Sequence, residues 1–184
     1  MADVRPRLLR PETAQDLDMA RQLFREYAAS LDFDLNFQDF DDELRRLPGD
    51  YVQPGGCLIL AMLDAEPVGC VALRRISGRI CEMKRLYITP TRRGTGVGRL
   101  LVETIIDSAR QIGYEKMRLD TVPSMDTARC LYASVGFEEI EPYRYNPIDG
   151  ATFMELDLSS ISTQDQNDYS GYQYEQGRSG CHRR

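Results

Sequence analysis

The chain has 184 residues, of which 42% are hydrophobic and 28% charged, and its formal net charge is −6. This length and composition allow one globular domain with a full hydrophobic core, and the negative balance argues against nucleic acid as the main partner. No apolar run reaches the roughly 18 residues of a transmembrane helix, and residues 1–6 lack the apolar core of a signal peptide, so we expect a cytoplasmic protein with no membrane partner.

Cysteine and histidine usage excludes several kinds of site. The five cysteines are scattered and lack the C-x-x-C spacing of metal sites, and the first four lie in apolar segments, so we expect buried thiols. The single histidine, His182, lies near the C-terminus. This position rules out a histidine-based triad or a histidine-ligated metal site in the core, and the sequence predicts no metal.

The N-terminal part of the chain predicts one strand and two helices. Residues 7–9 suit a short strand, and apolar positions recur at helical spacing over residues 14–30. A second, shorter helix is expected over residues 37–47, inside an acidic segment, residues 31–50. Acidic side chains beside apolar ones on a helix usually form its solvated face, and the alternative is an acidic rim that attracts a cationic ligand.

The following segment alternates strands and helices. Prolines and glycines bound the predicted strands, which cover residues 57–63, 68–73, 80–88, 117–122, 138–142 and 151–158. Helical spacing predicts helices over residues 98–112 and within 123–136. Closely spaced strands favour an antiparallel meander, whereas the strand, helix and strand within residues 80–122 form a parallel βαβ unit. We therefore expect a mixed α/β fold: a mostly antiparallel central sheet with one parallel pair and about four helices.

The composition changes after Leu158. Residues 159–184 are rich in Ser, Gln, Asn, Asp, Gly and Tyr. Such a segment cannot bury enough apolar surface to fold by itself. The sequence therefore predicts one domain over residues 1–158 and a disordered C-terminal tail over residues 159–184.

A glycine-rich turn joins a predicted strand to a predicted helix and is the strongest sign of a ligand site. Gly94, Gly96 and Gly98 let successive backbone N–H groups crowd together, and the first N–H groups of the following helix have no intrahelical partner. Residues 74–99 also contain eight basic residues against one acid. A phosphate or pyrophosphate is the natural ligand of such a turn.

The glycine spacing narrows the choice of ligand. A dinucleotide fold needs G-x-G-x-x-G, whereas this turn reads G-x-G-x-G, and no lysine follows the glycines as a P-loop requires. The turn instead resembles the acetyl-CoA motif R/Q-x-x-G-x-G/A of the GNAT superfamily of N-acetyltransferases, met by Arg93, Gly96 and Gly98. Residues 128–137 resemble a second motif of that superfamily, A-x-x-L-Y-x-x-x-G-F. The resemblance covers about residues 5–158.

This resemblance implies an N-acetyltransferase that uses acetyl-CoA as cosubstrate and acts by direct attack of an amine in a ternary complex. The pyrophosphate would lie on the N–H groups of the glycine turn, and the pantetheine arm would pair with a strand in the gap where two central strands splay apart. The implied cofactor-binding residues are Leu86, Tyr87 and Ile88 for the arm, and Arg93, Gly94, Thr95, Gly96, Val97, Gly98 and Arg99 for the pyrophosphate. Met125 stands where many members carry an asparagine that contacts the cofactor.

Two further residues match catalytic positions of the family. The reaction needs a neutral amine and a proton for the departing thiolate. The pKa of an alkylamine is about 10.4, so most of the amine is protonated at neutral pH and a base is useful. The resemblance implies Glu82 as the general base, acting through water or with a raised pKa, and Tyr132 as the general acid to the CoA sulfur. The alternatives are an exposed ion pair of Glu82 with Lys84 or Arg85, and a core role for Tyr132.

The acceptor and partners stay open. The acceptor would be a small-molecule or peptide amine. It would be cationic if the acidic residues 31–50 form a rim that attracts it to the site. Loop residues that either contact it or pack at the rim are Phe33, Asp34, Tyr51, Tyr143, Tyr145 and Asn146. The alternative function is a non-catalytic acyl-CoA-binding sensor or interaction module. A third interpretation treats the basic segment, residues 74–99, as a nucleic-acid-binding surface. A homodimer is a further open prediction.

Overall fold

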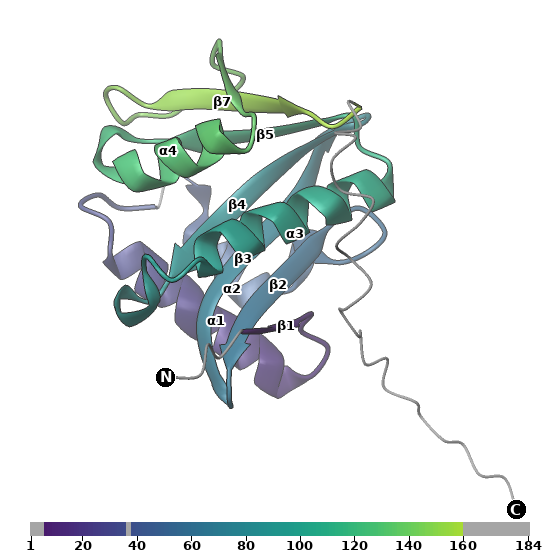
Figure 1. Cartoon of the computed structure of the whole chain (residues 1–184), viewed down its shortest axis with the longest axis vertical. Helices are drawn as coiled ribbons and strands as arrows, with labels where there is room; N and C mark the ends of the chain where they lie inside the picture. Colours follow the sequence, from purple (N-terminus) through teal and green to yellow (C-terminus); the bar gives the residue numbers. More distant parts are fainter. Residues whose placement is uncertain (1–5, 36–37, 160–184) are drawn as a thin grey trace, which may run out of the picture.

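The computed structural model describes residues 6–35 and 38–159, which form a seven-stranded sheet with helices on both faces (Figure 1). The strands are β1 (Arg7–Leu9), β2 (Cys57–Leu63), β3 (Glu66–Ser77), β4 (Ile80–Ile88), β5 (Lys116–Thr121), β6 (Glu138–Ile140) and β7 (Thr152–Asp157). The α-helices are α1 (Ala14–Ala29), α2 (Phe40–Arg46), α3 (Val97–Ile112) and α4 (Asp126–Ser134). The predicted tail lies outside the described residues from residue 160 onward.

The strands lie in the order β1-β2-β3-β4-β5-β7-β6. All neighbouring pairs are antiparallel except β4 and β5, which are parallel and are joined by the crossover helix α3. The predicted mixed α/β fold, with an antiparallel meander and one parallel βαβ unit, is confirmed. Local periodicity was sufficient for the meander because β2, β3 and β4 follow one another in sequence and pair in that order.

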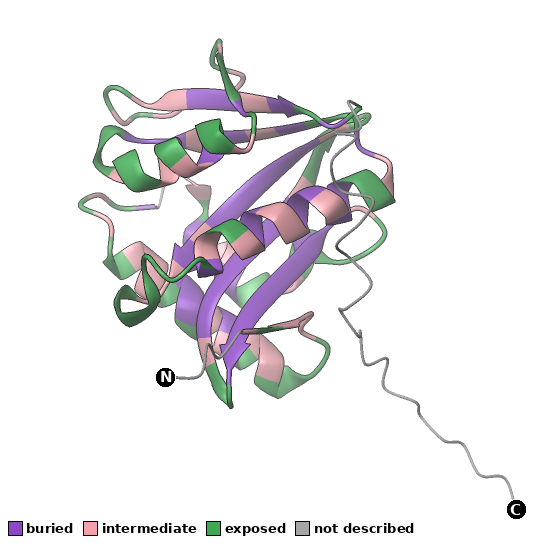
Figure 2. Ribbon diagram, in the orientation of Figure 1, coloured by how far each residue is buried: buried purple, intermediate pink, exposed green. Residues whose placement is uncertain are grey.

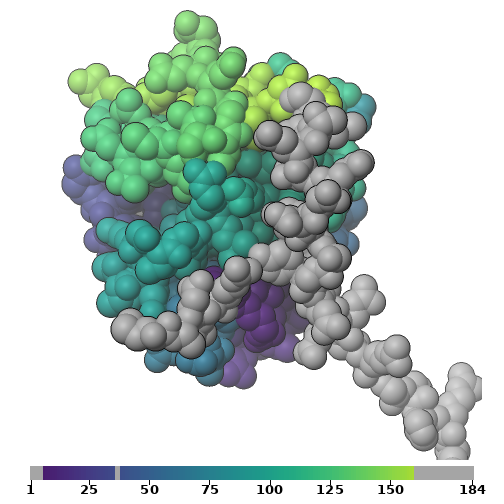
Figure 3. All heavy atoms as spheres, viewed as in Figure 1, coloured from purple at the N-terminus to yellow at the C-terminus, as the bar shows by residue number. Residues whose placement is uncertain are grey.

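Each face of the sheet has its own hydrophobic core. On one face α3 buries residues such as Leu101 and Ile105 against the central strands. On the other face α1 and α2 bury Phe24 and Leu44 against the opposite side chains of the same strands. Because both faces are covered, β2 is buried along its whole length, β4 along most of its length and β3 in its middle (Figure 2). On the face seen in Figure 3, the surfaces of α3 and α4 lie next to each other.

Some sequence predictions need correction. The second helix begins at Phe40 rather than at residue 37, and residues 36–37 lie outside the described part. Cys57, Cys70 and Cys81 are buried as predicted, but Cys130 is exposed, because α4 turns its neighbours at positions 128, 131 and 132 toward the core. Among the described helices, none is both long and apolar enough to cross a membrane.

The sheet opens between its two central strands. β4 and β5 are paired only where Ile80 to Glu82 face Lys116 to Arg118. Beyond this point β5 continues to pair with β7, and β4 with β3, but not with each other. Within residues 6–35 and 38–159, the backbone edge of β4 after Glu82 that faces β5 therefore has no strand partner.

Candidate active site

The three glycines of the turn have two different structural roles. Gly94 and Gly96 have φ angles of +76° and +88°, in the region that side chains rarely adopt, and a Cβ on either would meet no atom within 4 Å. Gly98 is already helical, and a Cβ there would lie 3.2 Å from Ile88 Cδ1. The first two glycines therefore shape an open turn, while the third lets α3 pack closely on β4.

The backbone N–H groups of this turn are available to a ligand. From Gly94 to Arg99, none donates a hydrogen bond to another described residue, and the first such bond is Leu100 N–H to Gly96 O at 3.1 Å. Side chains fix the turn instead: Thr95 Oγ1 donates to Arg92 O at 2.7 Å, and Arg93 Nε donates to Ile88 O at 3.2 Å. The six N–H groups at the N-terminus of a 16-residue helix form a cradle suited to a diphosphate.

A β-bulge shapes the strand that leads to this turn. Lys84 pairs with Ala72 and Tyr87 with Cys70, so two residues of β4, Arg85 and Leu86, oppose one residue of β3. Arg85 adopts a φ of +58°, a rare conformation for a side chain of this size. The extra residue changes the alternation of side chains along β4. As a result, Lys84 and Arg85 both face the α1 and α2 side.

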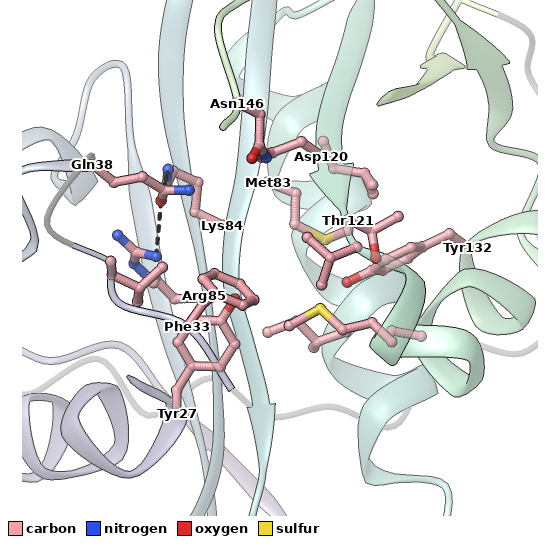
Figure 4. A pocket seen from close by; sticks show the side chains of 16 residues that line it. Tyr27, Phe33, Gln38, Met83, Lys84, Arg85, Asp120, Thr121, Tyr132 and Asn146 are labelled. Atoms are coloured by element: carbon pink, nitrogen blue, oxygen red, sulfur yellow. Dashed lines mark hydrogen bonds between the residues drawn. The ribbon is translucent and has the colours of Figure 1, made fainter. Parts of the chain in front are cut away.

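A pocket opens at the splay of β4 and β5 (Figure 4). One wall contains Tyr27, Phe33, Gln38, Lys84 and Arg85, and the opposite wall contains Asp120, Thr121, Tyr132 and Asn146. The predicted arm-binding residue Leu86 lines it too, as does Met125. The pocket therefore joins the unpaired edge of β4 to the first helical turns of α4.

Tyr132 reaches this pocket from α4. Its side chain is only 7% exposed and its ring lies 5.8 Å from that of Phe137. Burial raises the pKa of the phenol, so it stays protonated through the neutral range. Within the described residues its hydroxyl forms no hydrogen bond, and the buried Thr121 Oγ1 is also without a partner there. The pocket thus contains two hydroxyl groups that a ligand can engage.

Glu82 lies beside the pocket, in a buried ionic network. Its side chain is 1% exposed, Arg74 lies 2.8 Å from Oε2, and Oε1 accepts from the Tyr143 hydroxyl at 2.8 Å and lies 3.4 Å from Arg144. The predicted exposed ion pair of Glu82 with Lys84 or Arg85 is wrong. The bulge directs the Arg85 side chain toward α2, and the buried Glu82 carboxylate pairs with Arg74 and Arg144 instead.

The network also fixes the direction of the Glu82 pKa. Burial opposes the negative charge, but Lys84, Arg144 and Arg74 outweigh burial and hold the pKa below its ordinary value of 4.5. The predicted route through a raised pKa is therefore wrong. A route through water stays a prediction.

Arg85 and Glu43 form a second buried pair, which fixes α2 to β4. Arg85 donates to both carboxylate oxygens of Glu43, at 2.9 and 2.5 Å, and their side chains are 2% and 14% exposed. Tyr51 also donates to Glu43 at 2.8 Å. Glu43 is thus not on a solvated acidic face, as one interpretation of residues 31–50 predicts, since it compensates a buried guanidinium.

The loop residues predicted near the acceptor separate into different environments. Phe33 and Asn146 line the pocket, and Asn146 Nδ2 donates to Asp120 at 2.8 Å. Tyr143 belongs to the Glu82 network and Tyr51 to the core, whereas Tyr145 is 83% exposed and Asp34 lies on the surface. Sequence reasoning missed Lys84, Thr121 and Asp120. A basic residue within the apolar strand 80–88 was the available signal for Lys84.

Comparisons with known proteins agree with this geometry. The model of the acetyltransferase (GNAT) family matches residues 17–137. An uncharacterised N-acetyltransferase of Schizosaccharomyces pombe is 42% identical over 147 residues, covering 79% of this chain and 90% of that protein.

Two solved structures share the fold. A GNAT acetyltransferase from Staphylococcus aureus has a TM-score of 0.69 at 18% identity, covering 83% of this chain and 99% of that one. An acetyltransferase from Salmonella typhimurium, solved with its cofactor acetyl-CoA, has a TM-score of 0.61 at 19% identity, covering 86% and 98%. The match to the family model and the close relative identify the chain as a member of the GNAT family of acetyltransferases.

Proposed function

We propose that the protein transfers an acetyl group from acetyl-CoA to a primary amine by direct attack in a ternary complex. The observation that supports this most is the run of six backbone N–H groups, next to a splayed strand edge, that donate to no other residue in the described part of the chain. A GNAT structure with the same fold was solved with acetyl-CoA. When bound, acetyl-CoA would supply the thioester whose carbonyl carbon the amine attacks.

The residues of this chain fit the ligand. The N–H groups of residues 94–99 would hold the diphosphate, with Arg93 positioning the turn through Ile88. The free edge of β4 at Leu86, Tyr87 and Ile88 would hydrogen-bond the amides of the pantetheine arm, as an added strand does. Both sites lie on consecutive parts of β4 and α3, so one extended ligand can reach from the turn to the pocket.

Tyr132 and Glu82 would handle the protons. As the new C–N bond forms and the C–S bond breaks, the protonated Tyr132 hydroxyl would donate to the departing thiolate sulfur. Glu82 would accept the amine proton through water, since its buried carboxylate is already paired with Arg74 and Arg144. Free CoA and an N-acetylated product would result, and solvent would carry the proton gained by Glu82 back to the Tyr132 phenolate.

Replacing Gly96 by alanine tests the turn. At a φ of +88° a Cβ strains the backbone, and the displaced N–H groups should lower the affinity for CoA roughly tenfold. Gly78→Ala is the matched control, because Gly78 also has a positive φ with open space around its Cβ position but lies in the β3–β4 turn. Isothermal titration with CoA measures both variants. An equal loss in both would contradict the cradle.

Replacing Glu82 by glutamine tests the water route. We expect kcat to fall about tenfold, less than for a direct proton acceptor, with little change in CoA affinity. Rates are normalised to the folded fraction from circular dichroism, because Glu82 also pairs with two arginines. An unchanged kcat at full folding would limit Glu82 to its structural role.

The whole proposal is tested by release of free CoA from acetyl-CoA. The full chain is incubated with polyamines, aminoglycosides, amino acids and peptides, and thiol formation is followed with a chromogenic reagent. Amine-dependent thiol release supports the acetyltransferase. CoA binding by calorimetry without turnover on any amine would instead favour the non-catalytic sensor.

A further inference from the structure

Lys84 is a buried cation without a carboxylate partner among the described residues. It is one of two lysines in the chain, and it is 7% exposed on the wall of the pocket. Its Nζ donates to the neutral Gln38 Oε1 at 2.9 Å. By contrast, the second lysine, Lys116, pairs with Glu155 at 2.7 Å on the surface.

The other charged groups of the pocket are already compensated. Arg85 is held by both oxygens of Glu43. Asp120 accepts from Arg144 and, at 2.8 Å, from Asn146. Glu82 acts on Lys84 only at longer range, without a direct ion pair. A buried ammonium group that contacts no carboxylate is unfavourable, so the pocket is electrostatically complementary to an added negative charge.

The groups around Lys84 reinforce this complementarity. Arg74 on β3, Arg85 on β4 and Arg144 from the β6–β7 connection add positive charge, while Glu82 is the acid that opposes them. Burial, followed by the Arg85 guanidinium, lowers the pKa of Lys84 to about 7. A bound anion would raise this pKa again and keep the ammonium form.

Lys84 and Tyr132 lie on opposite walls of the same pocket (Figure 4). A small acceptor that fills the pocket would therefore contact both walls. The Thr121 hydroxyl on the Tyr132 side is a further donor with no partner among the residues that the structure describes. The pocket thus offers an anion site on one wall and the thioester position on the other.

We propose that the acceptor is a small molecule that carries a carboxylate as well as its amine, as an amino acid does, and that the Lys84 ammonium group binds this carboxylate. The inference rests on the proposed acetyltransferase function. It differs from the cationic acceptor that the acidic segment suggested, because the pocket itself is lined by Lys84 and Arg85, and Glu43, which pairs with Arg85, does not line it. The carboxylate would fix the molecule on β4 while its amine points to the wall that contains Tyr132.

The test compares amino acids with the carboxamides of the same amino acids, together with polyamines. Release of CoA by the full chain is measured at equal concentrations of neutral amine. We expect the kcat/KM of the best acid to exceed that of its amide by about tenfold or more. Equal values, or turnover with amides and polyamines alone, would overturn the carboxylate site and leave the acetyltransferase intact.

Lys84→Met should remove the preference for acids mainly by raising KM, and Lys84→Arg should keep part of it. Lys116→Met is the matched control and should keep the preference in full. If Lys84→Met does not fold, the comparison of acids with amides in the unmodified chain decides alone. If the protein binds CoA but releases none from acetyl-CoA with any amine, the proposed acetyltransferase function is wrong. The proposed carboxylate site, which rests on that function, would then be wrong as well.

Discussion

Replacing Tyr132 by phenylalanine is expected to lower kcat for acetyl transfer by about two orders of magnitude and to leave CoA affinity unchanged. The hydroxyl is the one atom removed. It faces the pocket and forms no hydrogen bond within the described residues, and burial raises its pKa, so the hydroxyl keeps its proton at neutral pH and has it present for transfer. Steady-state release of CoA gives kcat, and calorimetry with CoA gives the affinity.

Tyr145→Phe is the control for this prediction, because Tyr145 is 83% exposed and loses the same atom. Its kcat should not change. The Tyr132 ring packs on Phe137, and phenylalanine keeps this contact, so the variant should retain its melting temperature. A kcat close to that of the unmodified chain would leave Tyr132 with only its core role.

The sequence predicted the order of elements and the glycine turn because both depend on local information. Alternating or helical spacing of apolar residues specifies strands and helices, and Gly94 and Gly96 supply the φ angles that the turn needs. The parallel pairing of β4 and β5 followed from the helix between them. These features need no knowledge of distant contacts.

The pocket could not be predicted in the same way, because it depends on contacts between distant segments. The bulge at Arg85 changes which side chains of β4 share a face, and a positive φ at an arginine has no sequence signal. Glu82 meets Arg144, which lies 62 residues further along the chain (144 − 82), and Lys84 meets Gln38. The environment of each charged residue therefore became visible only in the folded chain.

Replacing Glu43 by glutamine is expected to destabilise the protein by about 3 kcal/mol near neutral pH, because Arg85 would stay buried without its counter-charge. The pair is almost inaccessible, at 2% and 14% exposure, so solvent screens it little. Glu103→Gln is the matched control. Glu103 pairs with Arg99 at 3.3 Å on the surface, where loss of an ion pair costs about 1 kcal/mol or less.

The pH dependence separates this charge effect from a packing defect. The Arg85 guanidinium holds the Glu43 pKa below its ordinary value of 4.5, although burial alone would raise it. Glu43 therefore contributes its full stabilisation above the unfolded pKa and loses it as the pH falls through the folded pKa. Urea unfolding of the unmodified chain and of the Glu43→Gln variant should show a difference in the free energy of unfolding that is constant near neutral pH and shrinks below about pH 4.5. A difference that persists unchanged in acid would mean that the amide disturbs packing rather than the ion pair that fixes α2 to β4.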